Sequence, residues 1–186
     1  MHRIGSILFL LTFFFGCRAA TPAPPPPSSD PPRAEVEKKP APPAPLRRKL
    51  QEGEPVTLVA LGDSITFGFG LDDPARDTYY QLFATALREA YSHSWLRVVN
   101  SGVNMETSAQ GLARVERDVL AHQPDLVTIL FGGNDYRQKR LPADLQKDLR
   151  SLIRRIRART KAEIILLTPP WEGPDPDTPF VHAVRG

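Results

Sequence analysis

The sequence predicts an α/β domain with three layers, α/β/α, in which a parallel sheet lies between two layers of helices. Four short apolar runs are typical of buried strands, and amphipathic stretches separate them in the order β-α-β-α-β-α-β. This alternation is typical of parallel sheets with helices on both faces. Polar clusters follow three of the runs, at the carboxyl ends where such sheets place their active sites.

The strands and helices follow one another from Pro55 onward. Apolar runs predict buried strands at residues 56–61, 96–99, 126–131 and 164–167. Apolar residues spaced three and four apart predict an amphipathic helix after each of the first three strands. The predicted stripes are Tyr79, Leu82, Phe83, Ala86, Leu87, Ala90 and Tyr91, then Leu112, Val115 and Val119, and then Leu145, Leu149, Leu152, Ile153 and Ile156, with Pro142 starting the third helix.

The first 17 residues predict an export signal. They combine a basic start with an apolar run that is shorter than the roughly 20 residues of a membrane span. Phe14-Phe15-Gly16-Cys17 resembles a bacterial lipobox, which implies that Cys17 carries lipid and anchors the exported protein to a membrane surface of the cell envelope, on the periplasmic or extracellular side. The alternative is an ordinary signal peptide or an uncleaved anchor with an inert Cys17. A single cysteine permits no disulfide within the chain.

Composition divides the rest of the chain into a linker and a domain. Residues 18–54 are rich in proline and lack apolar periodicity, so we expect a disordered linker, followed by one domain over residues 55–186. The formal net charge of +3 gives no indication of a nucleic-acid partner. The third predicted helix carries many Lys and Arg residues off its apolar stripe. They indicate a solvated face or a contact with anionic envelope polymers.

The three polar clusters suit acyl transfer. Gly62-Asp63-Ser64 follows the first strand, Gly102 follows the second, and Gly132-Gly133-Asn134-Asp135 follows the third. Ser64 offers a hydroxyl nucleophile, Gly102 an unobstructed backbone N–H, and Asn134 a neutral amide donor. Donors that converge on an attacked carbonyl stabilise the oxyanion that develops there.

These clusters resemble the motifs of the SGNH/GDSL family of serine esterases and lipases, over roughly residues 55–171. The resemblance implies that Ser64 is the nucleophile, supported by Asp63. It implies an oxyanion hole made by the N–H groups of Ser64 and Gly102 and the side chain of Asn134. It also implies a flavodoxin-like strand order of 2-1-3-4-5 and hydrolysis of lipid, aryl or acetylated-sugar esters, with no metal or other cofactor.

The family's Asp-x-x-His block is absent after residue 171. His182, which follows Asp177 and comes early in the chain, is the candidate base in that region, and the alternative is a loop histidine with no catalytic role, whereas His93 and His122 suit helix ends or the surface. The resemblance therefore predicts a domain without its last strand and helix, a truncated chain, and little activity because serine lacks its base. The alternatives are a non-catalytic envelope lipoprotein that binds an acylated glycan, and an unstable remnant.

Overall fold

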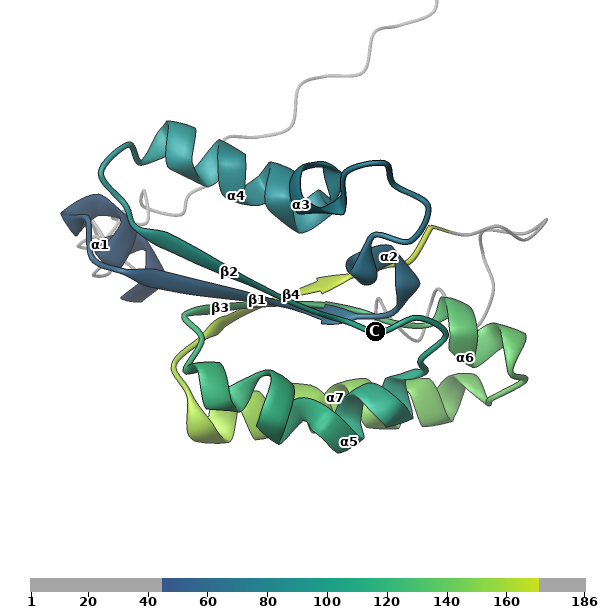
Figure 1. The fold of residues 1–186 in the computed structure, drawn as a ribbon. Helices are drawn as coiled ribbons and strands as arrows, with labels where there is room; N and C mark the ends of the chain where they lie inside the picture. Colours follow the sequence, from purple (N-terminus) through teal and green to yellow (C-terminus); the bar gives the residue numbers. More distant parts are fainter. Residues whose placement is uncertain (1–44, 171–186) are drawn as a thin grey trace, which may run out of the picture. The chain divides into compact units, whose positions relative to one another are not determined.

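The computed structural model describes residues 45–170, which form a four-stranded parallel sheet between two layers of helices (Figure 1). The strand order is β2–β1–β3–β4, so the predicted fold class is confirmed, and the order agrees with the first four strands of the flavodoxin-like arrangement. The strands are β1 Val56–Gly62, β2 Leu96–Gly102, β3 Leu126–Leu130 and β4 Glu163–Leu167. Within the described residues β4 is the outer strand beyond β3.

The helices cover the sheet from both sides. Figure 1 shows α5 and α7 on one face and α4 on the other. The bounds are α1 Pro45–Glu52, α2 Ser64–Phe67, α3 Pro74–Asp77, α4 Tyr79–Ala90, α5 Ser108–Asp118, the 3₁₀ turn η1 Leu120–His122, α6 Gly133–Arg137 and α7 Pro142–Arg159.

The face under α5 and α7 holds the larger core. Most of its buried members come from β1, β3 and the two helices, joined by Val119, Leu120 and Phe131, and Ile164 and Leu166 of β4 pack against them. Phe131 is fully buried there, directly against Gly111 of α5. A Cβ at Gly111 would lie 2.6 Å from Phe131 Cε2, so the glycine lets α5 approach the sheet closely. The opposite core is smaller, with Leu58, Ala60, Tyr80 and Leu126 buried under α4.

Two sequence expectations are corrected on the α4 face. The linker was expected to reach residue 54, but Pro45–Glu52 is helical because Leu46 and Leu50, four residues apart, pack toward the sheet. The predicted stripe of α4 is correct in part, since Tyr79, Phe83 and Leu87 pack against the core. Tyr80 and Ala84 are its buried residues, whereas Leu82 is 58% exposed.

The strands and the other two predicted helices follow the predictions closely. All four strands lie where the apolar runs predicted them, and Pro142 begins α7 as expected. Helix α5 begins at Ser108, earlier than its first predicted apolar residue, because Thr107 and Gln110 form a capping box that the prediction did not use.

The predicted export signal, lipidated Cys17, most of the linker and candidate base His182 lie outside the described residues. Within residues 45–170, no helix has both the length and the hydropathy that a bilayer span requires.

Candidate active site

Ser64 lies just beyond the carboxyl end of β1, where the chain turns into the short helix α2. Ser64 is partly exposed, whereas the two residues before it, Gly62 and Asp63, are buried. Asp63 caps the helix, since its Oδ1 accepts from the backbone N–H of Ile65 at 3.0 Å. The turn ends at Gly68, whose φ of +92° suits glycine. The strand and the cap therefore fix the backbone on both sides of the serine.

Gly62 is a position of close approach. A Cβ there would collide with Thr66 Oγ1 and would lie 2.8 Å from the carbonyl oxygen of Leu130. Thr66 is itself buried, and its hydroxyl lies 3.2 Å from the hydroxyl of Tyr79, which lies 3.1 Å from Thr128 Oγ1. This chain of hydroxyls ties α2 to α4 and to β3, so the segment that carries Ser64 is held against the sheet.

Asn134 lies in α6, immediately after β3, and is 3% exposed. Its Nδ2 donates to the carbonyl oxygen of Glu106 at 3.0 Å. An amide nitrogen carries two protons, so this bond uses one of them and orients the other. The side chain is therefore a buried, oriented donor at the same end of the sheet as Ser64, where Figure 1 places α2 and α6.

Gly102 is the last residue of β2 and pairs in register with Gly62 of β1. Its N–H donates to Asn100 Oδ1 at 2.9 Å, and a Cβ at this position would collide with the backbone N of Phe67. The glycine thus allows α2 to pack against the end of β2. Its predicted role as an oxyanion donor requires that the bond to Asn100 opens, and that role stays a prediction.

The three strand ends lie at one level. Gly62 is opposite Gly102 on one side and Leu130 on the other, and the N–H of Val103 donates to the carbonyl of Gly62 at 3.1 Å. The structure therefore brings the segments that carry Ser64, Gly102 and Asn134 to one edge of the sheet, as the sequence predicted.

Burial shapes the charge of Asp63. Its carboxyl is 3% exposed, and this burial raises its pKa, while the N–H of Ile65 acts in the opposite direction. The charge of Asp135 adds to the rise, and Arg137 opposes it. The ionised form of Asp63, which caps α2, is therefore less stable in the folded protein than it would be in water.

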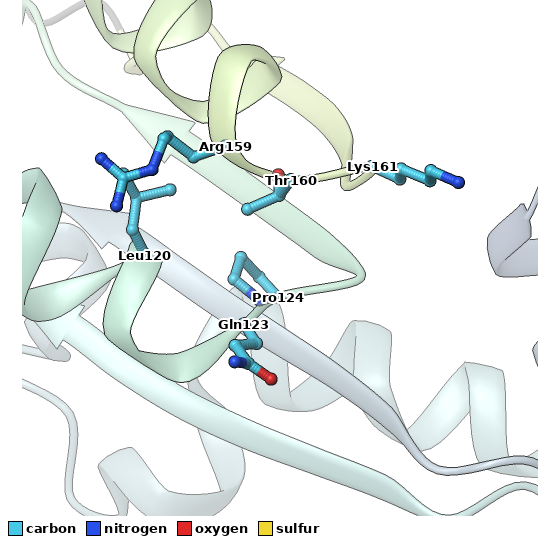
Figure 2. Close-up of a pocket in the computed structure, with 6 residues that line it drawn as sticks. All are labelled: Leu120, Gln123, Pro124, Arg159, Thr160 and Lys161. Atoms are coloured by element: carbon cyan, nitrogen blue, oxygen red, sulfur yellow. The ribbon is translucent and has the colours of Figure 1, made fainter.

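The histidines of the described chain lie at the other edge of the sheet. His93 precedes β2 and His122 precedes β3, so both are at the amino ends of strands. A shallow hollow at that same edge is lined by Leu120, Gln123, Pro124, Arg159, Thr160 and Lys161 (Figure 2). Neither histidine is placed to take a proton from Ser64.

Two buried ionic clusters next to the site had no specific sequence signal. In the first, Arg140 binds Asp135 and Asp148, each at 2.6 Å, and the hydroxyl of Ser108 donates to Asp135 at 2.7 Å. Through Ser108, Asp135 and Asp148 this cluster joins α5, α6 and α7, and Asp135 is the residue after Asn134. The sequence prediction had quoted Asp135 only as part of a motif. The second cluster is centred on Arg114, which binds Glu106 and Asp118.

Apolar side chains flank the edge that carries Ser64. The large exposed ones that follow β1 and β2 are Ile65, Phe67, Phe69, Leu71, Val103 and Met105. Phe69 is the most exposed of them, at 73%. Met105 has a φ of +65°, a backbone conformation that is uncommon for a residue with a side chain. We refer to these six residues as the apolar rim.

The described residues hold no group of three or more His, Cys, Asp or Glu side chains arranged for a metal ion. The carboxyl ends of the strands carry a serine hydroxyl, a side-chain amide and backbone N–H groups. Such groups can carry out acyl transfer once a base takes the proton of the hydroxyl.

Comparisons with known proteins agree with this chemistry. Residues 60–185 match the model of the GDSL-like Lipase/Acylhydrolase family. Esterase TesA of Pseudomonas aeruginosa is 38% identical over 128 residues, covering 67% of this chain and 61% of TesA. An acetylxylan esterase of Geobacillus stearothermophilus is 37% identical over 139 residues, covering 65% of this chain and 62% of that protein.

Comparison with solved structures finds the same proteins. The crystal structure of TesA matches with a TM-score of 0.59 and 34% identity, over 69% of this chain and 68% of that one. The chain spans about three fifths of the length of the two curated relatives.

Proposed function

The chain belongs to the GDSL-like lipase/acylhydrolase family, and from this premise we propose that it is a serine esterase whose nucleophile is Ser64. The observation that carries the proposal is the position of Ser64, partly exposed beyond the end of β1, at the edge where Asn134 is held as a buried donor. The esterases among the relatives support the reaction class, and they do not favour the reading as a non-catalytic lipoprotein.

The proposed reaction has two steps. Ser64 Oγ attacks the ester carbonyl and loses its proton to a base, and the carbonyl oxygen gains the negative charge of a tetrahedral intermediate. The N–H of Ser64 and Nδ2 of Asn134 stabilise that oxyanion, with Gly102 as a third donor once its N–H leaves Asn100. The alcohol departs with a proton from the base. Water then gives a proton to the same base and attacks the acyl-serine, and Ser64 leaves with that proton while the acid is released.

The base in this proposal comes from outside residues 45–170. His93 and His122 lie at the amino ends of strands, across the sheet from the nucleophile. His182 is the histidine of the carboxyl-terminal segment and is our candidate. A His182→Ala variant with unchanged turnover would exclude it without excluding Ser64.

The apolar rim supports an ester with an aliphatic acyl group as substrate. Phe67, Phe69 and Met105 offer exposed apolar surface on the segments that follow β1 and β2, and covering such surface favours binding by about 25 cal/mol per Å². A small-molecule or lipid ester suits this rim directly. In a glycan ester the acyl group would occupy it, and the sugar would extend into solvent.

We propose that lipid on Cys17 holds the enzyme at a membrane of the cell envelope. The apolar run and the lipobox-like residues 14–17 support this. Metabolic labelling with palmitate in a bacterial host should mark the wild type and not Cys17→Ala. Equal labelling of both forms would reject the anchor.

Hydrolysis of p-nitrophenyl butyrate tests the proposed function. Ser64→Ala should lose turnover, because no hydroxyl remains to form the acyl intermediate. Ser151→Ala is the matched control, since Ser151 lies on α7 and its hydroxyl donates to the carbonyl of Lys147. Equal turnover of Ser64→Ala and wild type would reject the serine mechanism.

A further inference from the structure

We infer that Arg114 is a positioning residue, which holds the ends of β1 and β2 and the amide of Asn134 in their catalytic arrangement. The inference rests on the proposed function. Arg114 lies on α5, beneath the sheet in Figure 1, and its side chain is only 7% exposed. A buried guanidinium needs several acceptors, because its five N–H groups are costly to leave without partners.

Arg114 has three partners from three parts of the fold. Its Nε donates to Glu106 Oε2 at 2.6 Å, its Nη1 donates to Asp118 Oδ2 at 3.0 Å, and its Nη2 donates to the carbonyl oxygen of Gly62 at 3.1 Å. Two of these partners adjoin the proposed catalytic groups.

The contact with Gly62 joins two strand ends. Gly62 comes two residues before Ser64, and its carbonyl also accepts the N–H of Val103, the residue after Gly102. The carbonyl oxygen of Gly62 therefore accepts two hydrogen bonds, one from the residue that follows β2 and one from Arg114. A shift of this carbonyl would move the nucleophile and the end of β2 together.

The contact with Glu106 leads to the amide donor. Arg114 holds the carboxylate of Glu106, and the carbonyl of the same residue accepts Nδ2 of Asn134 at 3.0 Å. The arginine therefore acts on Asn134 through one intervening residue. Its planar, forked donor array can hold these acceptors at fixed angles, whereas the single ammonium of lysine cannot.

Arg117 provides a matched comparison on the same helix. It binds the same carboxylate, Asp118, but its side chain is 78% exposed. Within residues 45–170 its hydrogen bonds go to Asp118, and Glu106 acts on it through charge without a direct hydrogen bond. If activity depended only on the charge of α5 or on the ion pair with Asp118, replacing either arginine would lower it. If activity depends on the positions of the catalytic groups, only replacement of Arg114 lowers it.

The test compares Arg114→Lys, Arg114→Gln and Arg117→Gln in the full chain. Turnover of p-nitrophenyl butyrate is divided by the amount of serine titrated with a fluorophosphonate, so that unfolded protein does not count. Both Arg114 variants should lose about 10²–10³-fold in kcat, the cost of one displaced oxyanion donor, and KM should change little. Arg117→Gln should match the wild type.

A second measurement does not depend on turnover. In ¹H–¹⁵N spectra the two Nδ2 protons of Asn134 should have the same chemical shifts in the wild type and Arg117→Gln, and should move toward the shifts of a solvent-exposed amide in Arg114→Gln. If Arg114→Gln does not fold, Glu106→Ala replaces it, because that variant removes the arginine's contact to the residue that orients Asn134.

Two results would overturn the inference. One is kcat per titrated serine in Arg114→Lys and Glu106→Ala equal to the wild-type value. The other is an Asn134 amide signal unchanged in every variant. Failure of the proposed function is a separate result, since it would appear as turnover that persists in Ser64→Ala.

Discussion

The side-chain amide of Asn134 donates to the carbonyl oxygen of Glu106 across 3.0 Å. This bond holds the amide plane while the side chain is buried at 3% exposure, so the donor is oriented before any substrate arrives. Oriented donors stabilise a developing charge without having to reorganise during the reaction.

Removing this donor should lower catalysis and leave binding largely unchanged. We expect Asn134→Ala to reduce kcat for p-nitrophenyl butyrate by about 10²–10³, since the oxyanion loses one hydrogen bond that forms fully only in the transition state. Gln81→Ala is the control, because Gln81 lies on α4, away from the segments that carry Ser64, Gly102 and Asn134. Similar kcat values in the two variants would contradict the role of Asn134.

Asp63→Asn should make the folded state more stable at pH 7. Burial raises the folded pKa of Asp63, so the folded protein binds more protons than the unfolded chain from the ordinary value of 3.8 upward, and stability falls as pH rises through this window. Asparagine removes the buried charge and still caps α2.

We expect a gain on the order of 1 kcal/mol at pH 7, and the gain should shrink as pH falls through the folded pKa toward 3.8. Urea unfolding at several pH values measures it. A stabilisation that did not depend on pH would show that the charge of Asp63 is not its cause.

Thr78→Val should also stabilise the protein. Thr78 is 1% exposed, and its Oγ1 has no hydrogen-bond partner among the described residues. Replacing a buried, unsatisfied hydroxyl by a methyl group of similar shape should raise the free energy of unfolding by about 1 kcal/mol. Thr66→Val is the contrasting variant, since the hydroxyl of Thr66 contacts Tyr79 and its loss should be destabilising. Equal effects of the two substitutions would count against this reading.

The apolar rim should set acyl preference. Phe69→Ser should lower kcat/KM for p-nitrophenyl octanoate by about tenfold, the amount expected when roughly one to two methylene groups lose apolar contact. The acetate ester should be affected much less, because its acyl group is too short to reach the ring. Trp95→Ser is the control, since Trp95 is exposed just before β2, at the amino edge. Equal losses for the two esters would remove Phe69 from the acyl site.

Local sequence patterns were sufficient for the sheet and the positions of Ser64 and Asn134. Apolar runs identified the strands because a buried parallel strand is apolar on both faces. Leu82 was wrongly placed in the stripe of α4 because it is as apolar as the residues that pack inward, and only the sheet decides which side of the helix is covered.

The ionic contacts could not be read from the sequence. Arg114 and Glu106 are eight residues apart, and Gly62 lies 52 residues from Arg114, so no local pattern joins them. The bond between Gly102 and Asn100 was missed for a different reason. A glycine at a strand end suggests an open N–H, while a side-chain acceptor two residues earlier can occupy it.

Mass-spectrometric mapping of the adduct formed with a fluorophosphonate tests the central claim most directly. A single adduct on the peptide that contains Ser64, absent from Ser64→Ala and retained in Ser151→Ala, is the result that this account predicts. Turnover accompanied by an adduct on a different residue, or by no adduct on Ser64, would contradict it.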